Sequence, residues 1–186
     1  EHNFAGFFWT RMADGYFRIA EKPASTLLHC GPGLANGLGN LHNTRRARSG
    51  VVNIVGDQAT FHRPYDAPLT ADTESLSRSV SSWVRTSLCA ADVGRDAAQA
   101  VQVAASLPGQ VATLILPSDA SWEEGGLVGE ALPKQISAAV DTMLIEEAAK
   151  ILRGRDPALI LLSAGGVLSA GQQLAWNIVK KTGADL

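Results

Sequence analysis

The residues best suited to chemistry lie where an apolar run ends in a histidine and a glycine-rich turn. The stretch from residue 26 to residue 33 reads Thr-Leu-Leu-His-Cys-Gly-Pro-Gly. An imidazole transfers protons near neutral pH, and glycines at a helix start leave backbone N–H groups open to an approaching ligand. His29 is therefore a candidate catalytic residue, and the turn of Gly31, Pro32 and Gly33 is a candidate ligand-binding segment.

Strand and helix patterns alternate around this turn. Apolar runs predict strands over residues 24–29, 51–55, 83–88 and 111–116. Periodic apolar spacing predicts helices over residues 4–20, 34–48, 73–82 and 90–106. This alternation predicts the α/β class, with a doubly wound parallel sheet and flanking helices on both faces. Residues 57–73 form a longer connection than such a fold needs, which indicates a functional loop or a contact with a neighbouring chain.

The composition changes after the last of these strands, so we expect two domains. The first is predicted to span residues 1–122, a linker residues 123–137, and the start of a second Rossmann-like α/β domain residues 138–186. That last part has one helix–strand–helix pattern, with its strand over residues 158–163, and is too small to stand alone. The chain begins with Glu1 rather than methionine, and we expect a fragment of a longer protein.

Composition and charge argue against several classes of protein. The chain has 186 residues and a formal net charge of -2, which provides no electrostatic attraction for nucleic acid or an anionic membrane. Its longest apolar run, residues 158–168, is too short to span a bilayer. The two cysteines, Cys30 and Cys89, form no close metal-ligand pair, so we expect a reduced, cytoplasmic protein without a metal site on this chain.

Other interpretations of the glycine turn stay open. A dinucleotide-binding turn has the pattern Gly-x-Gly-x-x-Gly, and Asp57 lies where the ribose-binding acid of such a domain belongs. The third glycine is displaced, because the position three after Gly33 is Asn36. Alternatively, the glycines only let the helix pack closely against the strand. A nucleophile–base pair of Cys30 and His29 is not expected, because neighbouring strand residues point to opposite faces.

Several short motifs occur in an order that is typical of a known family. They are Ala13-Asp14-Gly15-Tyr16-Phe17-Arg18, Lys22-Pro23, Leu28-His29-Cys30-Gly31-Pro32-Gly33 with Asn36, and Asn53-Ile54-Val55-Gly56-Asp57. Together they resemble the pyrimidine-binding domain of thiamine diphosphate enzymes, in the acetolactate synthase and benzoylformate decarboxylase group. Residues 161–166 and 182–184 are similar to the start of the central domain of that group.

The resemblance implies an enzyme that acts on 2-oxo acids. In this family a glutamate of the pyrimidine domain activates the cofactor, whose C2 ylide attacks the substrate, and loss of carbon dioxide leaves an enamine. Protonation of the enamine gives a decarboxylase, and its addition to a second carbonyl gives an acetolactate synthase-like carboligase. A separate domain binds the diphosphate and Mg²⁺, and its Gly-Asp-Gly motif does not occur in this sequence. The resemblance leaves open whether FAD binds the central domain.

The activating glutamate is where this sequence departs from the family. Relatives place it about two helical turns before the Ala13-Asp14 pair, and that position here is Gly6. Glu1 is the nearest upstream carboxylate, and five inserted residues in a continuous helix would turn it by roughly 140° relative to Asp14. We expect Glu1 to be the catalytic glutamate if the backbone loops out between them. Otherwise the chain is a non-catalytic relative.

The resemblance also assigns roles to other residues and to partners. His29 matches a histidine that faces the substrate in benzoylformate decarboxylase-like relatives, and His62 is a further candidate on the substrate side. The family's active site lies between two subunits, so a homodimer or homotetramer is expected, with a small 2-oxo acid as substrate and no nucleic acid or membrane partner. The residues expected to line the pyrimidine side of thiamine diphosphate are Gly31, Pro32, Gly33 and Asn36.

Overall fold

The computed structural model describes residues 5–135 and 139–186 and separates the chain into two compact units. The first unit is Glu1–Gln135 and the second is Ile136–Leu186. The domain and linker bounds expected from the sequence, 1–122 and 123–137, stay a prediction.

A parallel sheet of four strands forms the centre of the first unit. The strands are β1 (Ala24–His29), β2 (Val51–Asp57), β3 (Trp83–Thr86) and β4 (Val111–Pro117). Their order is β1-β2-β4-β3, and every neighbouring pair is parallel. The carboxyl ends of the strands therefore meet at one edge of the sheet, where His29 lies beside Gly56 in the register of β1 and β2. The α/β class predicted from the sequence is confirmed.

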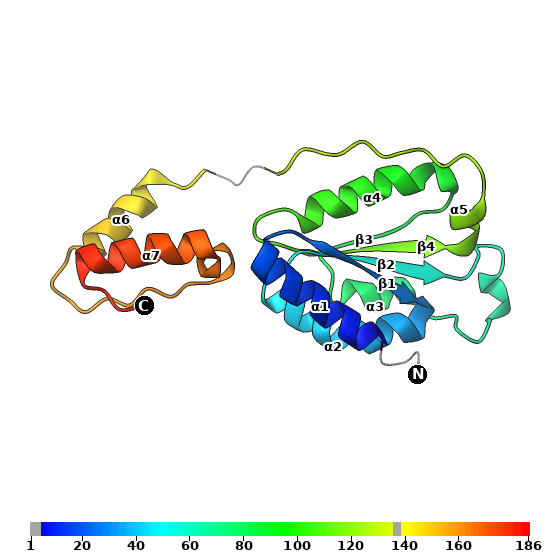
Figure 1. The fold of residues 1–186 in the computed structure, drawn as a ribbon, viewed down its shortest axis with the longest axis horizontal. Helices are drawn as coiled ribbons and strands as arrows, with labels where there is room; N and C mark the ends of the chain where they lie inside the picture. Colours follow the sequence, from blue (N-terminus) through cyan, green and yellow to red (C-terminus); the bar gives the residue numbers. More distant parts are fainter. Residues whose placement is uncertain (1–4, 136–138) are drawn as a thin grey trace. The chain divides into compact units, whose positions relative to one another are not determined.

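Helices cover both faces of this sheet (Figure 1). Helices α1 (Ala5–Ala20), α2 (Cys30–Arg46) and α3 (Thr73–Arg78) lie on one face, and α4 (Ala90–Ala104) lies on the other. A short helix, α5 (Ser118–Trp122), follows β4 directly and occupies the end of the predicted first domain. Within residues 5–135 and 139–186, none of the helices combines the length and the apolar character that a membrane span requires.

The alternation of side chains along the strands divides the core into two clusters. Leu28, Val55 and Ile115 point toward α2, where they pack with Leu34 and Leu41. On the other face, Val52 and Ala112 contact Ala100 and Ala104 of α4. Small alanines on α4 let this helix approach the sheet closely, so the alanine-rich sequence of residues 90–104 serves packing.

A ladder of polar side chains crosses the buried sheet at one level. The Thr26 hydroxyl donates to Oδ1 of Asn53 (2.6 Å), and Nδ2 of Asn53 donates to Oγ1 of Thr113 (3.2 Å). Ser81 lies 2.7 Å from the same hydroxyl. Since a shift of one residue would move each of these groups to the opposite face of the sheet, the ladder favours a single register for β1, β2 and β4.

The second unit contains α6 (Thr142–Leu152), the 3-10 helix η3 (Ala164–Val167) and α7 (Ser169–Thr182). The strand expected over residues 158–163 is wrong, because only one isolated parallel bridge, between Leu159 and Asp185, joins this segment to another. Its leucines are largely exposed, with 85% of Leu161 accessible. An apolar run forms a strand only where a neighbouring strand pairs with it along its length, and a single bridge does not supply that pairing.

Replacing Leu41 by alanine tests the core. Leu41 is fully buried in the cluster between α2 and the sheet, so Leu41→Ala should reduce the free energy of unfolding by about 2–5 kcal/mol through lost burial and a cavity. Leu88→Ala, at a side chain that is 65% exposed, should change it by less than about 0.5 kcal/mol. Urea denaturation followed by circular dichroism measures both. An equal loss of unfolding free energy in Leu41→Ala and Leu88→Ala would contradict the assignment of Leu41 to the core.

Candidate functional site

The candidate site lies where β1 ends and α2 begins. Helix α2 starts at Cys30, four residues earlier than expected, so the glycine segment forms the first helical turn and is no separate loop. Cys30 has a left-handed backbone, with φ of 51°, because the chain must turn sharply between strand and helix. Pro32 is tolerated in this first turn since its missing N–H would have no helical partner there.

Three of the expected site residues lie on the surface of this junction. His29 is the N-cap residue of α2, and its exposed side chain makes no capping hydrogen bond. Pro32 and Asn36 are also exposed, on the first two turns of the helix. An exposed imidazole and an exposed amide therefore lie on one short segment at a helix N-terminus.

Gly31 has a packing role that the sequence did not show. A Cβ at Gly31 would lie 2.3 Å from the Cβ of Ala71, at the end of the long loop after β2. The absent side chain therefore lets the chain's own loop approach α2. Gly33 is different, because a Cβ there would meet only ordinary contacts, the nearest at 3.5 Å from His29.

Gly6 occupies the position where the family resemblance requires a glutamate. A Cβ at Gly6 would lie 2.7 Å from the carbonyl oxygen of Gly33. The first turns of α1 and α2 thus touch through their backbones, and no carboxylate fits at Gly6 without moving one helix. Glu1, the alternative glutamate, lies outside the described residues.

Cys30 and His29 are closer than alternation along a strand would allow. The Sγ atom of Cys30 lies 3.9 Å from Nδ1 of His29, because Cys30 belongs to the helix and not to the strand. The expectation that the two side chains point apart is therefore wrong. Burial, together with the negative charge of Asp57, raises the pKa of the Cys30 thiol, which opposes the thiolate form that a nucleophile needs.

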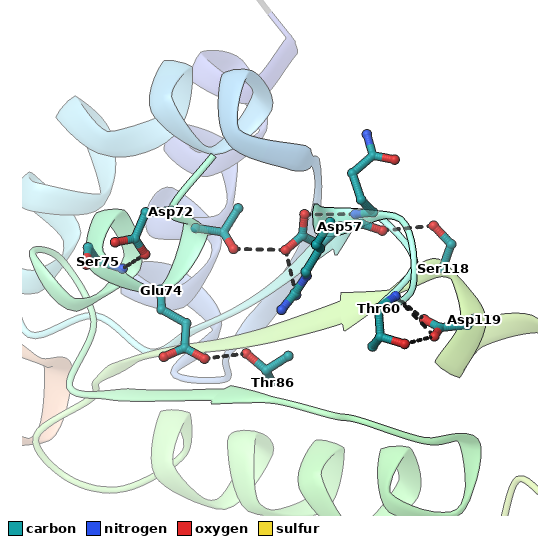
Figure 2. A network of polar contacts seen from close by, with 11 residues as sticks. Asp57, Thr60, Asp72, Glu74, Ser75, Thr86, Ser118 and Asp119 are labelled. Carbon is teal, nitrogen blue, oxygen red and sulfur yellow. Dashed lines mark hydrogen bonds and ion pairs between the residues drawn. The ribbon is translucent and has the colours of Figure 1, made fainter. Parts of the chain in front are cut away.

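Asp57, at the end of β2, holds the long loop by its carboxylate. Its Oδ2 accepts hydrogen bonds from Nη2 of Arg63 (2.7 Å) and Oγ1 of Thr73 (3.1 Å), and Oδ1 accepts one from the Gln58 backbone N–H (2.8 Å). Figure 2 shows these contacts around Asp57. Because both oxygens bind groups of the protein itself, this carboxylate is not free to bind a ribose as the dinucleotide interpretation requires.

A second buried carboxylate, Asp119, holds the start of the same loop. Both of its oxygens accept from the Thr60 backbone N–H at 3.1 Å, and the Thr60 hydroxyl also donates to it. Ser118 donates to the backbone carbonyl of Asp57 at 2.8 Å (Figure 2). The sequence analysis missed Asp119. The unusual length of the loop was the signal that such anchors would be needed.

His62 lies on this anchored loop, just before the 3-10 helix η2 (Arg63–Tyr65). Its side chain is exposed, and its ring centroid lies 6.4 Å from that of Tyr65. Among the hydrogen bonds of the described residues, none joins His62 to His29. Its assignment to the substrate side stays a prediction.

Glu74 anchors α3 to the neighbouring strand. It accepts a hydrogen bond from Thr86 of β3 at 2.7 Å and pairs with Arg78 at 3.0 Å, and these contacts lower its pKa. A cavity of about 210 Å³ lies between Asp57, Arg63 and Glu74. Across residues 5–135 and 139–186, no group of three or more histidine, cysteine, aspartate or glutamate side chains is arranged to hold a metal ion.

Comparisons with known proteins identify the class to which this fold belongs. Residues 10–76 match the family model of the N-terminal TPP binding domain of thiamine pyrophosphate enzymes. This match agrees with the resemblance that the motifs indicate. It includes α1 from Thr10 onward, the β1–α2 junction and the whole loop after β2.

Individual relatives agree with this class. The chain is 49% identical over 177 residues to a Mycobacterium tuberculosis protein described as "Putative acetolactate synthase large subunit IlvX", a match that covers 94% of this chain and 33% of the relative. The chain therefore spans about a third of the length of that curated relative.

Solved structures show the same fold. A "putative thiamin diphosphate-dependent enzyme isolated from Mycobacterium smegmatis" matches with a TM-score of 0.82 and 25% identity, over 94% of this chain and 34% of that one. A thiamine diphosphate-dependent 4-hydroxybenzoylformate decarboxylase of Rhodococcus jostii RHA1 matches with a TM-score of 0.64 and 24% identity, over 81% of this chain and 29% of that one. The second match supports the fold alone.

Two glycines of α2 provide a matched test of the junction. Gly31→Ala should reduce the free energy of unfolding by about 1–3 kcal/mol, because the new Cβ collides with Ala71. Gly39→Ala, on the same helix with nothing within 4 Å of the new Cβ, should increase it by up to about 1 kcal/mol. Chemical denaturation measures both. A stabilising Gly31→Ala would contradict the close approach of the loop.

The pH dependence of stability tests the Asp119 anchor. Burial raises the pKa of Asp119, but the hydrogen bonds from Thr60 outweigh this effect and hold the pKa below its ordinary value of 3.8. Because the folded pKa is depressed, the stabilisation is complete above the unfolded pKa and is lost as the pH falls through the folded value. Asp119→Asn should cost about 1–3 kcal/mol at pH 7, and this difference should shrink below about pH 4.

Asp66→Asn is the control for this pH experiment, because it removes an exposed carboxylate from the same loop. Its effect on the unfolding free energy should be small and nearly independent of pH. Denaturation curves for wild type and both variants between pH 3 and pH 7 separate the two carboxylates. A constant cost of Asp119→Asn across this range would exclude the assigned role.

Proposed function

We propose that this chain is part of a thiamine diphosphate-dependent enzyme that acts on 2-oxo acids, by decarboxylation or by acetolactate synthase-like carboligation. The observation that carries the proposal is the match of residues 10–76 to the TPP-binding domain, since this segment contains the β1–α2 junction with its accessible His29. The printed name of the M. tuberculosis relative supports the acetolactate synthase-like branch of this chemistry.

The residues at the junction fit the pyrimidine half of the cofactor. Asn36 and Pro32 present an amide and an apolar ring on the exposed side of α2, and Gly33 adds no side chain between them. Bound thiamine diphosphate would supply the carbon nucleophile and the electron sink for decarboxylation. The described residues do not fit Mg²⁺, because they form no cluster of ligands, so we assign the metal and the diphosphate to another domain. FAD has no assigned residue on this chain.

His29 has the most direct chemical role in this proposal. Its exposed imidazole lies at the carboxyl edge of the sheet, beside Gly56, and is free of any capping hydrogen bond. A histidine in this place can donate a proton to the substrate side of the site or remove one from it. We keep His62, on the anchored loop, as a further candidate on the substrate side.

The same proposal includes the setting of the enzyme. We assign the protein to the cytoplasm and expect a homodimer or homotetramer, because family members build each active site between two subunits. A small 2-oxo acid is the proposed partner, and neither nucleic acid nor a membrane is required.

The full-length polypeptide that contains these residues provides the test. With thiamine diphosphate and Mg²⁺, it should release carbon dioxide from at least one member of a 2-oxo acid panel. His29→Ala should lower kcat by roughly 10²–10⁴-fold and flatten the pH profile, because it removes the proton-transferring group. His42→Ala, at an exposed histidine farther along α2, should leave both unchanged. Absence of carbon dioxide and of a carboligation product from the wild type would exclude the proposal.

Gly6 favours a second candidate function, a non-catalytic relative of the family. The glutamate position has no carboxylate and no space for one next to Gly33. Such a protein would bind thiamine diphosphate and Mg²⁺, seen as a rise in Tm, without turning over any 2-oxo acid. Turnover that disappears in Glu1→Gln would instead identify Glu1 as the activating glutamate.

A further inference from the structure

A polar cavity lies between the long loop after β2 and the start of α3. It has a volume of about 210 Å³ and is lined by Asp57, Arg63 and residues 70–74. Pockets that take drug-sized ligands have volumes of roughly 300–1,000 Å³, and one water molecule occupies about 30 Å³. The cavity therefore has room for a small polar molecule and is too small for a nucleotide.

Two buried hydrogen-bond donors of the lining have no partner within residues 5–135 and 139–186. They are Nε of Arg63 and the hydroxyl of Thr70. Arg63 binds Asp57 through Nη2, at 2.7 Å, so its Nε–H is left over. Buried polar groups in folded proteins are nearly always hydrogen-bonded, because an unpaired one has lost its contact with water. Two such donors in one cavity therefore indicate a ligand with an acceptor group.

The lining also has an excess of negative charge. Asp57 already has an ion pair, but Asp72 and Glu74 add two further carboxylates, which Figure 2 shows at the start of α3. Glu74 pairs with Arg78 at 3.0 Å, whereas Asp72 accepts a hydrogen bond from the Ser75 backbone N–H and has no ion pair among the described residues. Hydrogen bonding by Ser75 lowers the pKa of Asp72, so this carboxylate is charged at neutral pH. A ligand at Asp72 should therefore carry a positive group.

We propose that this cavity binds a small zwitterion, an α-amino acid. The carboxylate of the ligand accepts hydrogen bonds from Nε of Arg63 and from the Thr70 hydroxyl, and its ammonium group lies at Asp72. An inorganic anion would satisfy both donors but would add negative charge beside two carboxylates. A simple amine would leave both donors unpaired. A ligand that carries both charges matches the whole lining.

A ligand in this cavity would act on the loop that packs against α2. Ala71 lines the cavity, and its Cβ would lie 2.3 Å from a Cβ at Gly31. A carboxylate held by Arg63 and Thr70 would join the middle of the loop to its end. Because a ligand that binds only the folded state stabilises it, the amino acid should stabilise this loop. The inference concerns a ligand site and does not rest on the proposed function.

Thermal denaturation of the full-length polypeptide that contains these residues tests the class of ligand. At millimolar concentration, at least one of glycine, L-alanine and L-serine should raise the Tm. Acetate and ethylammonium, which carry the two charges separately, should not raise it at the same concentration and ionic strength. No rise with any of the three amino acids would overturn the proposal, because water alone would then fill the cavity. An equal rise with acetate would also overturn it, since the ammonium group would then play no part.

Isothermal titration calorimetry of matched variants tests the location of the site. Thr70→Val removes the hydroxyl and keeps the shape of the side chain, so it should weaken binding by about tenfold or more, and Thr70→Ser should retain it. Asp72→Asn should weaken binding roughly two- to fivefold. Asp66→Asn is the control, because Asp66 is on the same loop and does not line the cavity.

The same variants separate lost binding from lost folding. Since no described residue bonds to the Thr70 hydroxyl, Thr70→Val should not lower the Tm of the ligand-free polypeptide. Asparagine caps helices about as well as aspartate, so Asp72→Asn should also keep the fold. Unchanged affinity in both Thr70→Val and Asp72→Asn would overturn the proposal, because the amino acid would then bind elsewhere on the protein.

Discussion

The close approach of neighbouring segments at glycines is the constraint on which the rest of this structure depends. Three glycines of α1 and α2 make it possible, since a side chain at Gly6, Gly31 or Gly37 would meet a neighbour at 2.7, 2.3 or 3.1 Å. Through these contacts α1 packs on α2, and the long loop packs on the first helical turn. The accessible face of His29, Pro32 and Asn36 exists because the opposite side of that turn is packed so tightly.

Two buried carboxylates hold the long loop between β2 and α3, which packs against Gly31. Asp57 binds Arg63 and Thr73, and Asp119 binds Thr60, so both ends of the segment from β2 to α3 are attached to the carboxyl edge of the sheet. Charge-assisted hydrogen bonds of this kind hold a loop in one conformation more firmly than neutral ones. These anchors restrict the conformations of the loop that carries His62 and Tyr65.

The packing at Gly6 also limits the chemistry that the chain can perform. The backbone contact that joins α1 to α2 occupies the place where the family resemblance calls for a glutamate. In the proposed enzymatic role the glutamate would therefore be Glu1, whereas the proposed non-catalytic role needs no carboxylate at this place.

The sequence by itself determined the class of fold and indicated the resemblance to thiamine diphosphate enzymes. Local patterns were enough to predict β1, β2 and β4 and the glycine turn after β1, because apolar runs and glycine spacing are local properties of the chain. Only the tertiary structure showed that Gly31 packs against Ala71 and that Asp57 and Asp119 accept hydrogen bonds from the long loop. It also showed that residues 158–163 form a single bridge and no strand. Each of these depends on a partner distant in sequence or on a strand that must pair, and local patterns carry no information about such contacts.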